Sequence, residues 1–183
     1  MAAARRVLVT GGVRSGKSRH AETLVAHRST VRYVATGPVP DPDGDPEWAD
    51  RVRRHRERRP AGWETAETAD LAAAVASAPG DVLVDCLGTW LTAVLDDLRA
   101  WDAADDGWRD ELDLRVDRFC AAWSERTRDG LLSVAVTNEV GWGVVPEHRS
   151  GRLFRDLLGT VNQRVAAASD DVLLVVAGRV LRL

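Results

Sequence analysis

A glycine-rich segment near the N-terminus has the residue types and spacing that most clearly predict chemistry. The segment runs from Gly11 to Ser18 with the pattern Gly-x-x-x-x-Gly-Lys-Ser. Lysine and arginine together number 25, and Lys17 is the only lysine. The run Arg6–Val9 precedes it as an expected strand, and residues 19–25 follow as an expected helix, which is the context in which such glycines form a phosphate-binding P-loop. The alternative is a glycine-rich turn that binds nothing.

Each residue type in this segment has a defined role toward a nucleotide. Glycines let backbone N–H groups turn inward around phosphate oxygens, and the helix N-terminus adds positive potential. Lys17 would reach the β- and γ-phosphates, and the Ser18 hydroxyl would ligate Mg²⁺. The residues that we expect to contact phosphate are Gly11, Gly12, Val13, Arg14, Ser15, Gly16, Lys17 and Ser18.

A P-loop usually works with an acidic residue at the end of a neighbouring strand, where the carboxylate holds the metal. Asp85 follows the apolar run Val82–Val84 and fits this role. The metal ligands predicted from the sequence are therefore Ser18 and Asp85. Two alternatives stay open. Asp85 could instead cap the helix that follows it, and Glu139, which follows the strand expected at 131–137, is a competing metal ligand.

A second unusual segment is strongly basic. In Arg51–Pro60, six arginines surround His55 on an expected helix, with Arg51 and Arg59 one turn either side of it on the same face. Cationic neighbours favour neutral imidazole and gather phosphate oxygens, and a neutral imidazole beside an α-phosphate is a nucleophile. A run of charge is more often a solvated helix face or a patch for nucleic acid. Periodicity alone favours such a surface.

Apolar runs and amphipathic stretches predict the elements that position these residues. Apolar strands separated by helices indicate an α/β fold with three layers and a mainly parallel sheet, in a single domain over residues 1–183. The loop Gly37–Pro46 contains four prolines and is expected at the surface. Strands are expected at 6–9, 31–36, 81–85, 131–137 and 172–177, with a candidate edge strand at 180–183, and helices at 19–25, 47–58, 68–78, 87–98, 110–128 and 152–168.

Composition limits the partners and the location of the protein. The formal net charge of −3 argues against nucleic acid as the main partner, although it is compatible with a local basic patch. No apolar stretch has the length of a membrane span or the pattern of a signal peptide. Two cysteines are too few for a disulfide framework, so we expect reduced thiols in a cytoplasmic protein.

Four blocks of sequence together carry a family resemblance. The blocks are Val9–Glu22; Tyr33–Thr36; Arg51–Pro60 with Trp63, Thr65 and Glu67; and Val136–Glu147 continuing to Val161–Arg164. In this order, and over nearly the whole chain, they resemble the bifunctional adenosylcobinamide kinase / adenosylcobinamide-phosphate guanylyltransferase family of cobalamin biosynthesis. The last block is the most specific, because generic P-loop proteins lack it.

The resemblance implies an activity and a set of site residues. Family members phosphorylate adenosylcobinamide with ATP or GTP, then take GMP from GTP onto a histidine and pass it to adenosylcobinamide phosphate, giving adenosylcobinamide-GDP. It implies that His55 is the guanylylated residue, with Lys17 also catalytic and Mg²⁺ as cofactor. A recombinase-like P-loop NTPase fold and a homotrimer are also implied. Beyond the P-loop, the implied nucleotide contacts are Thr36, Gly37, Arg56, Arg59 and Glu67.

Two positions and one loop depart from the family pattern. Some members have a histidine pair where this chain has Arg54 and His55, some have Glu where Asp85 stands, and the Gly37–Pro46 loop is longer here. The alternative function is a P-loop NTPase that acts as a regulatory or nucleic-acid-linked module through Arg51–Arg59, without guanylyl transfer. A member with kinase activity alone is a third hypothesis.

Overall fold

Seven strands among the described residues form one sheet, in the order β3-β2-β4-β5-β1-β6-β7. The structure, a computed structural model, describes residues 4–41, 43–128 and 130–183, without the side chains of Arg51 and Arg58. Neighbouring strands are parallel except β6 and β7, which pair antiparallel at one edge. The strands are β1 (Arg5–Thr10), β2 (Val31–Ala35), β3 (Glu64–Glu67), β4 (Asp81–Asp85), β5 (Leu132–Val136), β6 (Asp171–Val176) and β7 (Arg179–Arg182).

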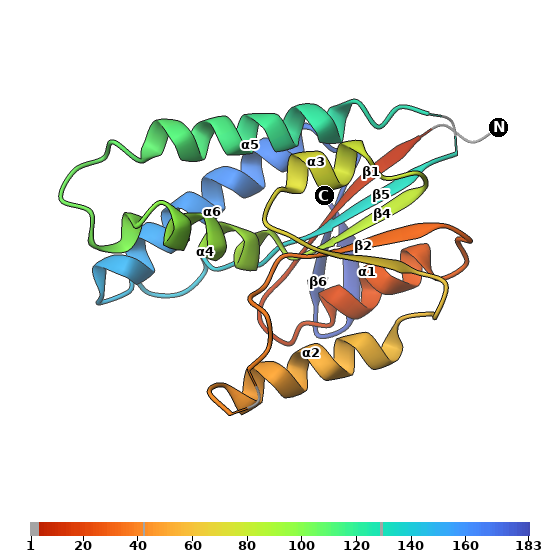
Figure 1. The fold of residues 1–183 in the computed structure, drawn as a ribbon, viewed down its shortest axis with the longest axis horizontal. Coiled ribbons are helices and arrows are strands. Elements are labelled where there is room, and N and C mark those ends of the chain that lie inside the picture. The colour runs from red at the N-terminus through yellow and green to blue at the C-terminus, as the bar shows by residue number, and fades with distance from the viewer. Residues whose placement is uncertain (1–3, 42, 129) are drawn as a thin grey trace.

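Helices cover both faces of the sheet (Figure 1). The helices are α1 (Lys17–Val25), α2 (Pro46–Arg58), α3 (Leu71–Ala76), α4 (Leu87–Asp97), α5 (Arg109–Ser124) and α6 (Arg149–Ala167), with a 3₁₀ turn at Ala100–Asp102. On one face α3, α4, α5 and α6 pack on strand residues such as Leu8 and Val34. On the other face α1 packs on the alternate residues, among them Val7 and Val9. The predicted three-layer α/β fold is therefore confirmed.

Some element boundaries differ from the sequence prediction. β3 was not expected, because Glu64–Glu67 is a short and mostly exposed edge strand without apolar alternation. α3 begins at Leu71 instead of residue 68, since the Asp70 carboxylate accepts the Ala73 N–H at 3.0 Å and caps the helix. α6 begins at Arg149, before the predicted residue 152. Within the described part of the chain, no helix is both long and apolar enough to cross a bilayer.

Arg126 explains why α5 ends before the predicted residue 128. Its guanidinium turns into the protein, where Nε donates to Ser133 Oγ on β5 at 3.0 Å. The Nη atoms donate to the carbonyls of Val75 and Ala78, both at 3.1 Å, and of Gly80. Burial lowers the pKa of this guanidinium. One buried side chain thus ties the end of α3, the turn into β4 and strand β5 together.

We expect Arg126→Ala to lower the free energy of unfolding by about 2–4 kcal/mol, because buried carbonyl oxygens would lose their donors. Urea unfolding followed by circular dichroism measures the change. Arg128→Ala is the matched control, since Arg128 is exposed two residues further on. Equal stability losses in the two variants would contradict this role for Arg126.

Asp171 joins three strands near the edge of the sheet and predicts a pH dependence. Its carboxylate, with a side chain 2% exposed, pairs with Arg5 on β1 and Arg182 on β7. The hydrogen bond from Arg5 holds the pKa of Asp171 below its usual value. This stabilisation is complete above the unfolded-state pKa of about 3.9 and is lost as the pH falls. We expect the urea midpoint of unfolding to fall more steeply on acidification in the wild type than in Asp171→Asn. Equal slopes in the two proteins would refute this role for Asp171.

Candidate active site

The P-loop connects β1 to α1 through backbone turns that need glycine. Gly16 has a left-handed φ of 96° immediately before α1, which glycine adopts without steric strain. An added Cβ on Gly11 would lie 2.4 Å from the Val175 carbonyl oxygen, so a larger residue would push the loop away from β6. The Gly178 N–H donates to the Ser15 carbonyl at 2.9 Å and holds the β6–β7 turn against the loop.

Lys17 and Ser18 are the first two residues of α1, and their side chains reach the P-loop backbone and Asp85. The Lys17 side chain is buried, and its Nζ donates to the Gly12 carbonyl at 3.2 Å, so the ammonium lies across the loop. The Ser18 Oγ donates to Asp85 Oδ1 at 3.3 Å. Strand β5 separates β4 from β1, and the start of α1 spans this gap. The structure thus brings the two predicted metal ligands together.

Asp85, at the end of β4, is shared by three side chains. Besides the bond from Ser18, its Oδ2 accepts the Tyr33 hydroxyl at 2.8 Å and lies 3.4 Å from His55 Nδ1. Burial raises the pKa of Asp85, but hydrogen bonds from His55 and Tyr33 and the charges of His55 and Lys17 outweigh burial and leave that pKa below its usual value. Burial also raises the pKa of Tyr33 well above its usual value, so its hydroxyl stays protonated and donates.

The Ser18 and Asp85 oxygens fit Mg²⁺. A hydroxyl and an ionised carboxylate are hard oxygen ligands, and Mg²⁺ at nucleotide sites takes one or two such groups together with phosphates and water. Among the residues that the structure describes, no group of three or more His, Cys, Asp or Glu side chains is arranged to hold a metal ion by itself. An ion at Ser18 and Asp85 would therefore complete its coordination from the nucleotide and from solvent.

The competing acid, Glu139, follows β5, the strand that lies between β4 and β1 in the sheet. Its backbone N–H donates to the Gly11 carbonyl at 3.1 Å. Its carboxylate accepts the Gly141 N–H at 3.2 Å. Because Ser18 donates to Asp85, the geometry favours Asp85 over Glu139 as the second metal ligand.

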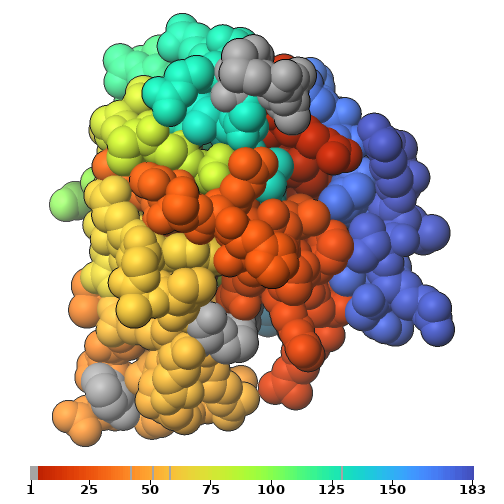
Figure 2. All heavy atoms as spheres, turned by 90° about the vertical axis from the view of Figure 1, so that its right-hand side faces the viewer, coloured from red at the N-terminus to blue at the C-terminus, as the bar shows by residue number. Residues whose placement is uncertain are grey.

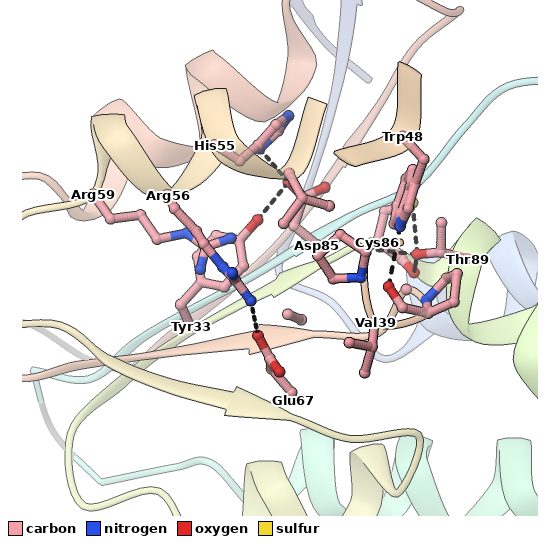
Figure 3. A pocket seen from close by; sticks show the side chains of 15 residues that line it. Tyr33, Val39, Trp48, His55, Arg56, Arg59, Glu67, Asp85, Cys86 and Thr89 are labelled. Atoms are coloured by element: carbon pink, nitrogen blue, oxygen red, sulfur yellow. Dashed lines mark hydrogen bonds and ion pairs between the residues drawn. The ribbon is translucent and has the colours of Figure 1, made fainter. Parts of the chain in front are cut away.

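His55 projects from the inner face of α2 toward Asp85 (Figure 3). Its side chain is 17% exposed, and Nδ1 lies 3.6 Å from Glu22 Oε1 on α1 as well as close to Asp85. Arg53 and Arg54, by contrast, are 59% and 67% exposed and pair with acidic residues of α2 itself. The charges of Arg53 and Arg54 are therefore compensated within α2, while His55 faces the inner side of the helix. The interpretation as a solvated helix face holds for Arg53, whereas Arg54 lines the pocket beside the P-loop.

Arg56 and Arg59 fasten α2 to the neighbouring strands. Arg56 pairs with Glu67 at the end of β3. The Arg59 guanidinium carbon lies 3.4 Å from the centroid of the Tyr33 ring on β2, a cation–π contact. These three predicted nucleotide contacts, Arg56, Arg59 and Glu67, thus form one wall beside His55. The side chain of Arg51, which the sequence places one turn from His55, lies outside the described residues.

Thr36 and Gly37 follow β2, and Gly37 lines the same pocket as Arg56, Arg59 and Glu67. The Thr36 hydroxyl is buried and donates to the Cys86 carbonyl at 2.8 Å, so it faces protein atoms. The indole of Trp48 covers Gly37 so closely that an added Cβ would lie 2.4 Å from its Cζ2. Trp48 Nε1 also donates at 3.0 Å to the carbonyl of the residue after Gly37. The proline-rich loop is thereby closed onto α2.

Two pockets meet at His55, which lines both. The P-loop pocket is lined by Val13, Arg14, Ser15, Gly16, Lys17, Ser18, Arg19, Glu47, Asp50, Arg54 and His55. The second pocket, called the Trp48 pocket here and drawn in Figure 3, is lined by Tyr33, Ala35, Gly37, Pro38, Val39, Pro40, Trp48, Val52, His55, Arg56, Arg59, Glu67, Asp85, Cys86 and Thr89. Figure 2 shows α1 between the α2–β3 segment and the β6–β7 edge.

Three residues of this site are absent from the sequence prediction. Glu22 lies one turn after Ser18 on α1, and helical spacing could have placed both on the same face. Tyr33 is the single tyrosine of the chain, but only the pairing of β2 with β4 brings it beside Asp85. Trp48 carried no signal, because its contact with Gly37 depends on how the long loop folds.

A mainly parallel sheet covered on both faces, a P-loop after β1 and an acid that reaches its serine define a P-loop nucleotide-binding protein. Sequence comparison narrows this class. The family described as cobinamide kinase / cobinamide phosphate guanyltransferase matches residues 7–183. The chain belongs to this family, as the four sequence blocks predicted.

Curated relatives agree over nearly their full lengths. The chain is 43% identical to the bifunctional adenosylcobalamin biosynthesis protein CobU of Salmonella typhimurium, over 94% of this chain and 96% of the relative. It is 41% identical to the protein of the same name from Escherichia coli, with the same coverage. It is 38% identical to CobP of Pseudomonas aeruginosa, over 94% of each chain.

A solved structure supports the fold independently. An ATPase from the type III secretion system of pathogenic bacteria superposes with a TM-score of 0.53 at 13% identity, over 93% of this chain and 50% of that chain. An identity this low shows the fold alone.

Proposed function

We propose that this chain, acting as a single catalytic domain over residues 1–183, phosphorylates adenosylcobinamide and then attaches GMP to the product. The family and the relatives' names support both activities. The observation that carries the proposal is a shared carboxylate: Asp85 lies 3.3 Å from Ser18 Oγ and 3.4 Å from His55 Nδ1. A histidine is thereby held next to the place where nucleotide phosphates would bind.

In the kinase step, the P-loop backbone and Lys17 hold the β- and γ-phosphates of ATP or GTP. The hydroxyl of the aminopropanol arm attacks the γ-phosphorus and gives up its proton to solvent as the new O–P bond forms. The bond to the β-phosphate oxygen breaks, and the nucleoside diphosphate leaves. Mg²⁺ held by Ser18 and Asp85 would offset charge on the phosphate oxygens. Lys17, buried across the loop, stabilises charge that develops on the leaving oxygen.

In the transfer step, His55 attacks the α-phosphorus of GTP. With Nδ1 facing Asp85 and Glu22, the other ring nitrogen, Nε2, makes the P–N bond while pyrophosphate leaves. A phosphate oxygen of adenosylcobinamide phosphate then attacks the same phosphorus, the P–N bond breaks, and adenosylcobinamide-GDP forms. Splitting one transfer into two displacements in this way is nucleophilic catalysis.

The two pockets support a single orientation of the nucleotide. Phosphates in the P-loop pocket and the base in the Trp48 pocket would bring the α-phosphate past His55, which lines both. Gly37, Arg56, Arg59 and Glu67 line the Trp48 pocket and would contact the sugar and the base. Thr36 would contribute indirectly, because its hydroxyl donates to the carbonyl of Cys86, a residue that lines this pocket.

The finer aspects of partner and location are part of the same proposal. We place the enzyme in the cytoplasm as a homotrimer, with adenosylcobinamide and its phosphate as acceptors and no nucleic acid. The nucleic-acid alternative is weakened because the exposed guanidinium groups of Arg53 and Arg54 already pair with Asp50 and Glu57.

Incubation with α-labelled GTP and Mg²⁺, followed by peptide mapping, tests the proposal. We expect an acid-labile, alkali-stable adduct on His55, together with phosphorylation of adenosylcobinamide by ATP in a parallel reaction. An absence of adduct at saturating GTP would contradict the guanylyltransferase activity, and only the kinase activity would remain proposed. Salt-sensitive binding of DNA or RNA without any adduct would favour the regulatory module.

A further inference from the structure

The segment between β5 and α6 is anchored at both ends. At its start, Asn162 Nδ2 donates to the Asn138 carbonyl at 3.0 Å, and the Glu139 N–H donates to the P-loop carbonyl of Gly11 at 3.1 Å. At its end, Arg152 Nη1 donates to the Pro146 carbonyl at 3.0 Å. The conformation of this loop is therefore set by the body of the protein at two separate points.

Between these anchors the loop presents apolar side chains to solvent. Trp142 is 70% exposed, Val144 94% and Val145 64%. Val13, at the tip of the P-loop, is 75% exposed. Because β1 and β5 are adjacent parallel strands, the segments that follow them emerge side by side. We call these four residues the Trp142 surface. Apolar side chains held in solvent by an anchored loop are typical of a surface that binds something.

The position of this surface limits its occupant. A nucleotide in the P-loop pocket would direct its γ-phosphate toward Lys17, and Glu139 joins the loop to that same P-loop. An acceptor whose hydroxyl attacks the γ-phosphorus must reach in from the rim that the Trp142 surface borders. A large acceptor that carries its hydroxyl on an arm could rest on this rim while the arm reaches the γ-phosphorus.

We infer that the Trp142 surface binds the corrin ring of adenosylcobinamide while its arm reaches the P-loop; this inference rests on the proposed function. The ring has broad apolar faces and methyl groups that match an indole and valines. The cobalt(III) corrin of adenosylcobinamide carries a net positive charge, and the carboxylates of Glu139 and Glu147 flank the apolar residues. Shape, polarity and charge thus favour this acceptor over an anionic partner.

The test is calorimetric titration of adenosylcobinamide into the full chain without nucleotide. We expect the Kd of the double variant Trp142→Ala/Val144→Ser to rise about tenfold or more, because the variant would bury less apolar area against the ring. Leu114→Ala is the matched control, since Leu114 is 42% exposed on α5 and should leave the Kd unchanged. Labelling of His55 by GTP alone should stay at the wild-type rate in both variants.

Each other outcome has a defined meaning. An unchanged Kd in the double variant would overturn this inference and leave the proposed function standing. A change in sedimenting mass caused by the double variant would make the surface an interface between copies of the chain, which also overturns it. A wild-type chain that binds no adenosylcobinamide would refute the proposed function and this surface with it.

Discussion

Replacing His55 by alanine is expected to abolish covalent labelling by α-labelled GTP, by more than about a thousandfold, because the variant has no nucleophile at this position. The kinase step should persist within about tenfold, since γ-phosphoryl transfer depends on the P-loop, Lys17 and the metal ligands. Radiolabel incorporation and product analysis with ATP and adenosylcobinamide measure the two activities on one preparation.

Arg53→Ala is the matched control for that experiment. It removes a charge from the outer face of the same helix, where Arg53 pairs with Asp50 and Glu57, so labelling should stay within about twofold of wild type. Labelling of His55→Ala at the wild-type level would remove His55 from the mechanism. Loss of both activities in a His55→Ala variant that unfolds normally in urea would show that the two reactions share this group.

The part of the site that could be predicted from the sequence depends on short-range patterns. The P-loop is a contiguous motif with a strand before it and a helix after it, so residues 11–18 specify their own geometry. Asp85 is predictable because a buried parallel strand is a continuous apolar run, and an acidic residue at the end of such a run is easily recognised. The arginines around His55 made it a candidate nucleophile, but helical spacing alone favoured a solvated basic face, and only the resemblance favoured the catalytic role.

The rest of the site depends on contacts between distant segments. Tyr33 reaches Asp85 through the pairing of β2 with β4, and no local pattern specifies that pairing. β3 is polar and forms only because an open sheet edge lies beside it. Arg126 looks like one more charge near a helix end, and its burial follows from carbonyls that converge from α3 and the turn after it. Such residues need the whole fold before their roles become visible.

Asp85 connects the two reactions through one carboxylate. Oδ1 faces Ser18 and the proposed metal, while Oδ2 faces Tyr33 and His55. Its pKa lies below the usual value in spite of burial, so both oxygens carry charge at neutral pH. The same group can therefore hold a cation for phosphoryl transfer and accept the Nδ1–H of His55 for guanylyl transfer.

Asp85→Asn is consequently expected to reduce both activities by about a hundredfold or more. The amide keeps the size of the side chain but removes its charge, which weakens metal binding and leaves the His55 Nδ1–H without an anionic partner. Kinase assays over a range of Mg²⁺ concentrations should show a raised requirement for the metal, and single-turnover labelling with GTP measures the histidine step.

Glu139→Gln separates this role of Asp85 from a general effect of lost charge near the P-loop. Glu139 follows β5, as Asp85 ends β4. Its backbone N–H donates to the P-loop while its carboxylate accepts the Gly141 N–H, so its variant should keep the wild-type Mg²⁺ requirement. If Glu139→Gln instead raised that requirement and Asp85→Asn did not, the second metal ligand would be Glu139. If Asp85→Asn slowed the kinase but left His55 labelling unchanged, the shared carboxylate would serve one reaction only, and His55 would be activated by Glu22 alone, which lies 3.6 Å from its Nδ1.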